Sequence, residues 1–325
     1  MTTSYQEKTL NYTSYRLEFF NGVRFGHGNL DSTDISFHAD TLFSALYQEA
    51  LKLNKENLFL EFVENDRLLF SDGFPYIGKE YFIPKPMLKI ERKSSASRGD
   101  SREKKLIKNM KYIPVELLEE YINGDFPLDQ MDLLHNLGKS GMRVSVGISG
   151  NEDPEPYRVN AFYFNDGNGL YIIVGFQDEK VKNLFEELLE SLSYTGVGGK
   201  KSTGLGRFEY QESEISTNLE KKLQKAGKIN ILLSTAMAAD MELEKILDCA
   251  YYSLLKRGGF IDSEKYAEQQ MRKQERYVFI PGSCFQQVFK GTVITEKNRG
   301  THPIFRYEKA LFLGVEINAS NIVST

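Results

Sequence analysis

The residues best suited to chemistry in this sequence lie in one short segment, GVGGKKSTGLGRF, at positions 196–208. It holds five glycines, two adjacent lysines, a serine and a threonine. Glycine has no Cβ and tolerates positive φ, so such a loop can turn its backbone N–H groups toward an anion, and neighbouring lysines add charge. The segment therefore predicts a phosphate-binding loop. An ordinary solvent-exposed turn is the alternative.

Two familiar nucleotide-binding motifs do not fit this loop. A Walker A motif places one lysine directly between glycine and Ser/Thr, whereas here Lys200 and Lys201 both precede Ser202. Walker A and the dinucleotide fingerprint also follow a strand and open a helix. The present loop follows a predicted helix and precedes a predicted strand, so neither motif applies.

A second group of polar residues lies at the start of a predicted helix. His38, Asp40 and Thr41 precede its apolar face, and Arg24 and His27 lie in the loop before it. Unpaired N–H groups and the helix dipole favour a phosphate at such a helix start. Helix capping by Asp and Thr is the alternative for the first group, and a solvated loop for the second.

Positive charge is also concentrated between Lys85 and Lys111. This stretch has ten Lys/Arg and three Asp/Glu, a local net of +7 in a chain with a net charge of −4. Residues 94–101 are rich in Ser and Gly, with almost no apolar side chain to pack. The stretch predicts either phosphate contacts through residues such as Lys89 and Arg92 or a solvated arm.

Composition excludes several classes of protein. The chain has 325 residues, of which 41% are apolar, so a wholly disordered chain is excluded. Its slight acidity excludes coating of nucleic acid through bulk charge. Two cysteines are too few for a disulfide framework or a zinc site, and Asp31, Asp34 and Asp40 are scattered. With no apolar signal core or membrane-length segment, we expect a soluble, cytoplasmic protein without metal or cofactor.

The elements that position the loop follow a recognisable order. Tyr15–Phe20 predicts a strand, 37–53 a helix, and 158–164 and 170–176 a hairpin. Apolar residues between Val181 and Leu192 predict an amphipathic helix, and Leu205–Tyr210 a last strand. This is the split βαβ order of a ferredoxin-like domain at 1–213, with residues from about 54 to 140 inserted and the Gly-rich loop at 196–206.

A second domain follows a charged connector. We expect strands at 228–234, 277–280 and 309–317, and a helix over 242–260 stopped by Gly258 and Gly259. The predicted fold class is α+β, with two ferredoxin-like (RRM-like) domains. The first carries the large basic insertion and a projecting β-hairpin; the second, at 226–325, is degenerate.

Several segments together resemble the RAMP superfamily of CRISPR RNA-binding proteins. One is the helix followed by the G-x-G, lysine/hydroxyl and G-x-G-R-F pattern. The others are FHADTLFSAL (37–46), YFIPKPML (81–88), PGSCF (281–285) and THPIFRYEKALFLGV (301–315). As a set they span about 15–315 and resemble the two-domain subunit that caps the guide RNA 5′ end in type III-A (Csm) effector complexes. Glu308 departs from the family's RYG-like stretch, where glycine is expected.

The resemblance implies a non-catalytic subunit. It would bind the single-stranded 5′ handle of crRNA and contact both the large polymerase-like subunit and the first backbone RAMP subunit. It would also reach target RNA with a hairpin "thumb", here 142–164 with its tip around Ser149–Pro156; an ordinary surface hairpin is the alternative. The expected RNA-binding residues are Arg24, His38, Asp40, Thr41, Lys85, Lys89, Arg92, Arg143, Ser145, Gly196, Gly198, Gly199, Lys200, Lys201, Ser202, Thr203, Gly204, Gly206 and Arg207.

The sequence is also compatible with two other functions. A RAMP-type, metal-independent endoribonuclease that processes precursor crRNA needs a general base near a 2′-hydroxyl, and His38 is the best candidate among four histidines. A Gly-rich loop close to the C-terminus is expected of such nucleases, whereas here 119 residues follow Gly206. A protein scaffold that holds no RNA of its own is the third possibility.

Overall fold

A computed structural model of the chain describes residues 9–26, 30–90, 105, 107–147, 155–261, 271–296 and 300–317. Its helices are α1 (Ala39–Lys52), α2 (Glu56–Glu64), α4 (Leu118–Asn123), α5 (Glu179–Thr195), α6 (Thr217–Gln224) and α7 (Asp240–Leu247). Its strands are β1 (Asn11–Phe19), β2 (Leu68–Phe70), β3 (Phe74–Ile77), β4 (Glu80–Pro84), β5 (Tyr112–Pro114), β6 (Gly138–Gly147), β7 (Glu155–Phe164), β8 (Asn168–Phe176), β9 (Phe208–Ser213), β10 (Ile229–Leu232), β11 (Leu254–Arg257), β12 (Arg276–Phe279), β13 (Cys284–Phe285), β14 (Gly291–Glu296), β15 (Ile304–Lys309) and β16 (Phe312–Val315).

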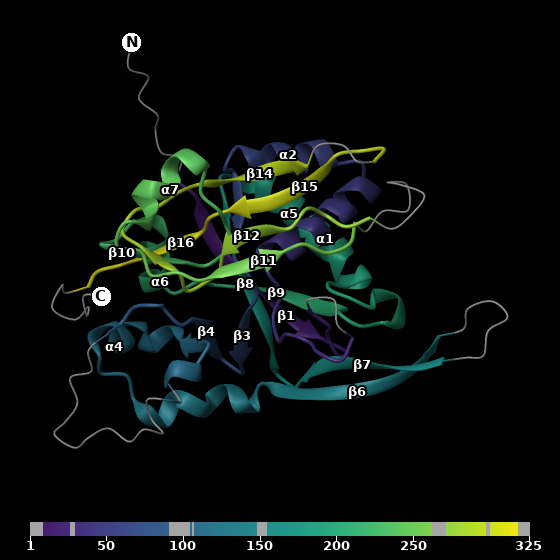
Figure 1. Cartoon of the computed structure of the whole chain (residues 1–325), viewed down its shortest axis with the longest axis horizontal. Coiled ribbons are helices and arrows are strands. Elements are labelled where there is room, and N and C mark those ends of the chain that lie inside the picture. The colour runs from purple at the N-terminus through teal and green to yellow at the C-terminus, as the bar shows by residue number, and fades with distance from the viewer. Residues whose placement is uncertain are drawn as a thin grey trace, which may run out of the picture.

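A seven-stranded sheet forms the centre of the molecule. Its strand order is β5-β4-β3-β8-β1-β9, and β2 also pairs with β8. Every pairing in it is antiparallel. The segment at 54–140, expected as an insertion, therefore supplies four strands of this sheet. The fold is a mixed α/β architecture with antiparallel sheets, which agrees with the predicted α+β class (Figure 1).

The helices that position the Gly-rich loop form as the sequence predicts. In α5, six apolar residues from Val181 to Leu192 are buried, and the Asp178 carboxylate caps the helix by accepting from the Val181 N–H at 3.1 Å. The helix ends at Gly196, where φ is 88°. Helix α1 packs beside α5 and buries Leu42, Phe43 and Leu46 against the sheet.

The expected pairing of 158–164 with 170–176 is wrong. Both segments are strands, but β7 pairs along its whole length with β6, whereas β8 pairs with β1, β2 and β3. The residue types of the two segments predicted strands correctly. The short Asn/Asp/Gly loop between them suggested that they pair with each other, but each strand pairs with a segment more distant in the sequence. The β6–β7 hairpin projects away from the central sheet, so a projecting hairpin is present, and its tip at 148–154 lies outside the described residues (Figure 1).

The C-terminal part differs from expectation at one helix. Helix α7 ends at Leu247, Cys249 adopts a positive φ of 54°, and Leu254–Arg257 form strand β11, which pairs with β12. Leu, Lys and Arg favour a helix intrinsically, but pairing with β12 overrides that propensity and the helical period.

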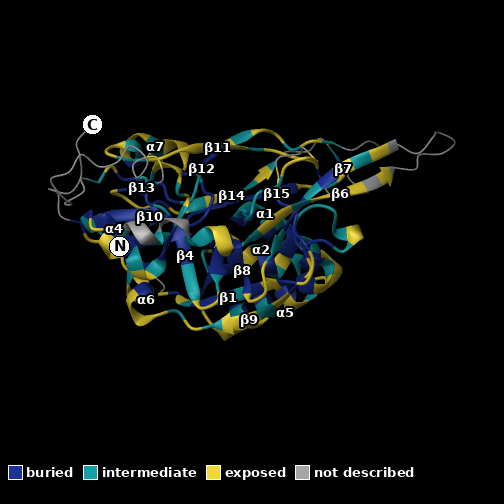
Figure 2. Cartoon of the chain, turned by 90° about the horizontal axis from the view of Figure 1, so that it is seen from below, coloured by how far each residue is buried: buried dark blue, intermediate teal, exposed yellow. Residues whose placement is uncertain are grey.

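The two faces of β8 bury separate hydrophobic clusters. Leu170, Ile172 and Val174 join the cluster under α1 and α5, while Tyr171 and Ile173 join a cluster on the opposite face. That second cluster also holds residues of the C-terminal part, including Ile231 and Leu313. Figure 2 shows buried residues concentrated in the centre and exposed residues along the outer part of the hairpin. The N-terminal and C-terminal parts therefore share one packed interior.

The segments that carry the family resemblance meet in this interior. Phe43 of α1 and Tyr307 of β15 have ring centroids 5.6 Å apart, and Tyr307 stacks on Phe70 at 4.5 Å. The Met87 N–H donates to the Gly282 carbonyl at 2.9 Å. Glu308, where glycine was expected, is 2% exposed and its carboxylate accepts from Arg276 at 2.7 and 3.3 Å.

Candidate RNA-binding site

The Gly-rich loop is held by its own backbone and by the segment that follows β1. The Val197 N–H donates to the Gly206 carbonyl at 3.0 Å, and the Gly206 N–H donates to the Gly22 carbonyl at 3.1 Å. The Gly199 N–H donates to the Arg24 carbonyl at 2.9 Å. The middle of the loop, Lys201–Thr203, forms a single 3₁₀ turn. The loop is a defined structure attached to the sheet rather than a loose turn.

Two glycines are required by close packing. At Gly206, where φ is 78°, an added Cβ would lie 2.1 Å from the Val197 carbonyl oxygen. At Gly198, where φ is 97°, it would lie 2.6 Å from the carbonyl oxygen of Arg24. Any side chain at either position would push the two backbone segments apart. These glycines therefore set the shape of the loop.

The two lysines of the loop point to different neighbours. The Lys200 ammonium lies 4.8 Å from the centroid of the Tyr157 ring on β7 and donates to its hydroxyl at 3.1 Å. The Lys201 ammonium donates to the Gln48 amide oxygen of α1 at 3.4 Å. Ser202 and Thr203 are exposed, as is Arg207 after the loop. Lys200 thus ties the loop to the projecting hairpin, and Lys201 faces α1.

At the start of α1, His38 is the N-cap residue but Asp72 supplies the cap. One Asp72 oxygen accepts from the Ala39 N–H at 2.9 Å and from the Thr235 N–H at 2.7 Å. The other contacts His38 Nδ1 at 2.6 Å. Asp72 is 3% exposed. This carboxylate fixes the orientation of His38 and joins α1 to the C-terminal part of the chain.

Asp40 and Thr41 are engaged by an arginine from β11. Arg257 contacts both Asp40 oxygens, at 2.8 and 2.7 Å, and donates to the Thr41 hydroxyl at 3.1 Å. Burial acts to raise the pKa of Asp40, but the charge and hydrogen bonds of Arg257 outweigh it and lower the pKa to about 2. Asp40 is therefore a carboxylate near neutral pH, paired with a bidentate guanidinium.

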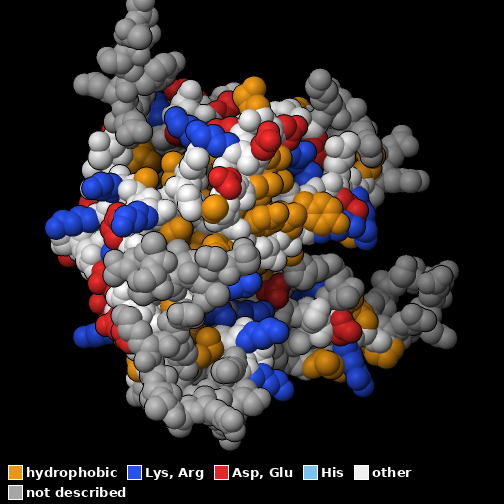
Figure 3. Space-filling view, turned by 60° about the vertical axis from the view of Figure 1, so that its left-hand side comes forward, with side chains coloured by type: hydrophobic (Ala, Val, Ile, Leu, Met, Phe, Trp, Pro, Cys, Tyr) orange, Lys and Arg blue, Asp and Glu red, His pale blue; other side chains and the backbone are white. Residues whose placement is uncertain are grey.

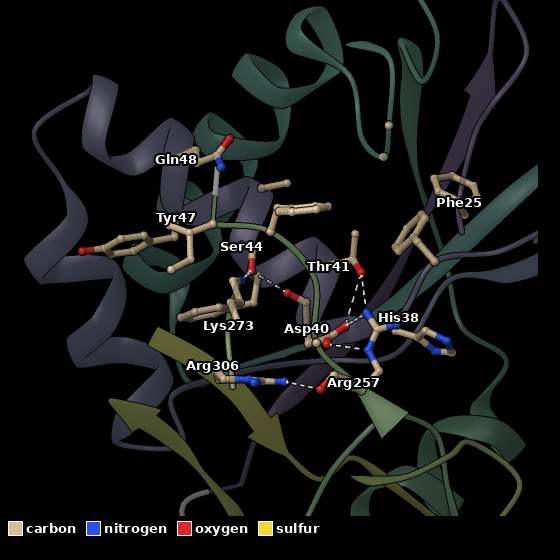
Figure 4. Close-up of a pocket in the computed structure, with 18 of the residues that line it drawn as sticks. Phe25, His38, Asp40, Thr41, Ser44, Tyr47, Gln48, Arg257, Lys273 and Arg306 are labelled. Atoms are coloured by element: carbon tan, nitrogen blue, oxygen red, sulfur yellow. Dashed lines mark hydrogen bonds and ion pairs between the residues drawn. The ribbon is translucent and has the colours of Figure 1, made fainter. Parts of the chain in front are cut away.

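These groups surround one cavity of about 740 Å³ between α1, the Gly-rich loop and strands of the C-terminal part. Seven of the predicted RNA-binding residues line it, together with Arg257, Lys273 and Arg306 and with apolar side chains such as Phe25 and Tyr47. Figure 4 shows Arg257 directed at Asp40 and Thr41, with Lys273 beside Ser44. The seven predicted residues are Arg24, His38, Asp40, Thr41, Gly198, Gly199 and Lys201.

Lys273 adds a cation from the C-terminal part. Its ammonium donates to the Ser44 hydroxyl at 3.4 Å, and burial lowers its pKa. A buried ammonium near an aqueous cavity is stabilised by an anion that enters the cavity. The cavity can therefore accept a phosphate group, with apolar walls for the attached nucleoside.

Other predicted residues lie away from the cavity. Lys85 donates to the carbonyl of Ile107 at 2.6 Å, and burial lowers its pKa. Lys89 is exposed in the basic stretch. Figure 3 shows one group of Lys and Arg side chains in the lower half of the face viewed there and others in its upper half. Arg143 is exposed on β6, 5.3 Å from the Tyr163 ring centroid. Ser145 lies on the same strand, and Arg92 and His27 lie outside the described residues.

Sequence reasoning missed Asp72, Arg257 and Lys273. Asp72 follows a short strand, and nothing local distinguishes it from a turn residue. Arg257 was assigned to a helix that does not form, and Lys273 follows a segment without a clear pattern. Their role depends on contacts between residues more than 30 positions apart, such as Asp72 with His38.

Within the described ranges, no cluster of His, Cys, Asp and Glu side chains has the arrangement of a metal site. No helix in the same part of the chain is both long and apolar enough to cross a membrane.

Solved structures share this fold. The chain matches a subunit in a structure of a Csm3–Csm4 subcomplex of the type III-A CRISPR–Cas interference complex, with a TM-score of 0.62 and 16% identity over 93% of this chain and 99% of that chain. It also matches a subunit in a structure of a Csm1–Csm4 cassette in complex with AMPPNP. The TM-score is 0.59, and the identity is 16% over 94% of this chain and 98% of that chain. The chain therefore shares the fold of these subunits.

Sequence relatives define the family. A protein of Mycobacterium tuberculosis (H37Rv), named CRISPR system Cms protein Csm4, is 33% identical over 96% of this chain and all of its own length. The protein of the same name from Streptococcus thermophilus is 32% identical over 95% of this chain and all of its own length. The model of the CRISPR Csm4 C-terminal domain matches residues 225–315. The chain belongs to the Csm4 family of CRISPR proteins.

Proposed function

We propose that this chain is the non-catalytic crRNA-binding subunit of a type III-A interference complex, acting in the cytoplasm. It binds the single-stranded 5′ handle of the guide RNA on the Gly-rich loop and the adjoining cavity. The observation that carries the proposal is the convergence of the loop, Lys201, His38 and Lys273 on one cavity with apolar walls. Cationic groups suit phosphates, and apolar walls suit a nucleoside.

The role of each predicted residue follows from its contacts. Lys200, Lys201 and the exposed Ser202 and Thr203 are the groups on the loop that contact phosphates, and the glycines allow the RNA strand to approach the backbone. Asp40 acts indirectly, by holding Arg257 and Thr41 at the start of α1. Lys85, Lys89 and Arg92 add sequence-independent contacts to the backbone.

The partners are proposed from the solved relatives. Those relatives were determined with Csm1 or with Csm3. By analogy, this chain bridges the large polymerase-like subunit to the backbone RAMP subunits. The β6–β7 hairpin, with Arg143 and Ser145 on β6, is proposed as the thumb that reaches the target RNA.

We also propose a division into domains. Residues 1–213 form a ferredoxin-like domain with an insertion at about 54–140 and the loop at 196–206. Residues 226–325 form a second, divergent one. The strand order β9-β1-β8, with α1 and α5 packed on one face, supports the first assignment.

Charge reversal at the loop tests RNA binding. The double variant Lys200→Glu/Lys201→Glu, in the assembled complex, should reduce the guide RNA retained per complex and lower the salt dependence of RNA binding by about 1.4 in the log–log slope. The matched control is Lys221→Glu/Lys245→Glu, an equal charge change at exposed lysines of α6 and α7. Unchanged RNA retention in the loop variant would contradict the proposed site.

The His38–Asp72 contact gives the processing endoribonuclease a specific observation in its favour, because a histidine oriented by a carboxylate can serve as a general base. A structural role also explains this carboxylate, because Asp72 caps α1 and accepts a hydrogen bond from the Thr235 N–H. Sequencing of co-purified RNA distinguishes the functions: one common 5′ tag supports handle binding, precursor repeats with cleavage products support processing, and partners without RNA support a scaffold.

A further inference from the structure

An exposed aromatic side chain lies beside the Gly-rich loop. Phe20, the residue after β1, has 61% of its surface exposed, whereas the neighbouring Phe19 is 8% exposed and packs in the core. Among the described residues, no other aromatic ring packs against Phe20. Phe20 is thus a large apolar side chain that stays in water at the end of a paired strand, where a ligand can reach it.

The neighbour of Phe20 across the strands is Arg207. Phe19 pairs directly with Phe208, and the Phe20 N–H donates to the Arg207 carbonyl at 3.3 Å. Because successive residues of a strand alternate between faces, Phe20 and Arg207 lie together on the face opposite the helices. Arg207 is exposed, and the Asn21 amide donates to the Gly204 carbonyl at 3.4 Å. Phe20 and Arg207 therefore occupy neighbouring backbone positions on one face, at the edge of the loop.

This pair matches the repeating chemistry of single-stranded RNA. Each nucleotide carries one phosphate, which a guanidinium binds, and one base, which stacks on an aromatic ring. The backbone is held in place at both residues, because Phe20 extends a paired strand and Arg207 follows a loop shaped by its glycines. A preorganised platform loses little entropy when a base stacks on it.

Charge limits the extent of this platform. Glu18 and Glu209 pair directly with each other, one step further along the same face, and both are exposed. Two carboxylates at that position repel a phosphate backbone. An RNA strand can therefore contact the end of the face at Phe20 but not its continuation along β1 and β9.

We infer that Phe20 is a base-stacking residue for single-stranded RNA, with Arg207 binding the adjacent phosphate. The inference rests on the proposed function, and it adds a residue that the family resemblance did not supply. A neighbouring protein subunit covering Phe20 is the competing explanation, and the experiment includes it as an outcome.

The chain contains no tryptophan, so Phe20→Trp introduces a single fluorescent reporter. The full chain is titrated with a mixed-sequence single-stranded oligoribonucleotide, and binding is followed in parallel by the anisotropy of labelled RNA. We expect the fluorescence of Phe20→Trp to be quenched at saturation. Tyr277→Trp, at a position with 56% exposure on β12, is the matched control and should stay unquenched.

Affinity separates stacking from general hydrophobicity. Phe20→Leu should weaken RNA binding about tenfold, whereas Phe20→Tyr should stay within about twofold, because stacking requires a π face. Since the side chain is exposed, all three variants should unfold at the same denaturant concentration as the unsubstituted chain.

The outcomes distinguish this inference from the proposed function. RNA binding with unchanged affinity in Phe20→Leu and no quenching in Phe20→Trp would overturn the stacking role and leave the proposed function in place. Absence of RNA from both the isolated chain and the assembled complex would overturn both. A loss of partner subunits from Phe20→Leu after ribonuclease treatment would identify Phe20 as a protein contact and overturn the inference.

Discussion

The ion pair between Arg257 and Asp40 connects the C-terminal part of the chain to helix α1 across the cavity, and its removal tests how the site is held. Arg257→Ala leaves the Asp40 carboxylate without its partner. Asp40→Asn removes the charge but keeps the shape. The double variant completes a cycle that isolates the interaction of the two side chains.

The expected magnitude follows from the surroundings of the pair. The Arg257 and Asp40 side chains are only 16% and 20% exposed, and the guanidinium contacts both oxygens. Lowering the pKa of Asp40 from 3.8 to about 2 corresponds to about 2 kcal/mol of stabilisation of the charged form. We expect a coupling energy of about 2 kcal/mol, and a loss of about 3 kcal/mol for Arg257→Ala, since it strands a partly buried charge.

Urea unfolding at neutral pH, followed by circular dichroism, measures these free energies. The neighbouring strand residue supplies the control: Lys256 forms an ion pair with Glu275, but both side chains are at least half exposed. Lys256→Ala should leave the urea midpoint unchanged, because solvent screens such a pair.

The pH dependence has a definite sign. Because the pKa of Asp40 is lower in the folded chain, the pair stabilises the fold above about pH 4, and that stabilisation is lost as the pH falls toward about 2. The cycle should therefore give a constant coupling energy from about pH 5 to 8 and a smaller one at pH 3. A coupling energy below about 0.5 kcal/mol at neutral pH would refute the reasoning, as would a coupling energy that does not change on acidification.

Further predictions concern the loop, the histidine and the departure from the family pattern. Gly206→Ala should lower the free energy of unfolding by more than about 2 kcal/mol and weaken RNA binding, because the new Cβ meets a carbonyl oxygen. In the control Gly204→Ala the nearest atom is 3.7 Å from the new Cβ, so thermal unfolding should show a loss of only about 1 kcal/mol. His38→Ala should leave crRNA processing intact in cells, and accumulation of uncut precursor RNA would contradict the non-catalytic role. Glu308→Gln should lower stability by about 2 kcal/mol, because Arg276 loses a buried carboxylate partner; an unchanged urea midpoint would show that the pair contributes nothing.

The sequence predicted the local parts of this structure well. Helix α5 and its Gly196 terminus follow from apolar periodicity and from glycine chemistry, which act within a few residues. The loop likewise depends on residue types in one short segment, and the structure shows why Gly198 and Gly206 cannot be replaced. The strand segments at 158–164 and 170–176 were also correct.

The errors involve contacts between distant residues. The partner of β7 is β6 rather than β8, because a strand buried on both faces accepts several partners that its own sequence does not specify. Arg257 was placed on a helix, and only the pairing of β11 with β12 directs it toward Asp40. In the candidate site, the residues of α1 and the loop were predictable, and their partners from the C-terminal part were not.

The shared hydrophobic cluster on the second face of β8 has a consequence for synthesis of the chain. Tyr171 and Ile173 are covered by residues that include Leu313, and 102 residues lie between the end of β9 and the end of β16. At about 5–20 residues per second, the ribosome needs roughly 5–20 s to add them. During that interval the apolar sheet face lacks its C-terminal cover, so the N-terminal part needs protection against aggregation, as chaperones provide, until the last strand emerges.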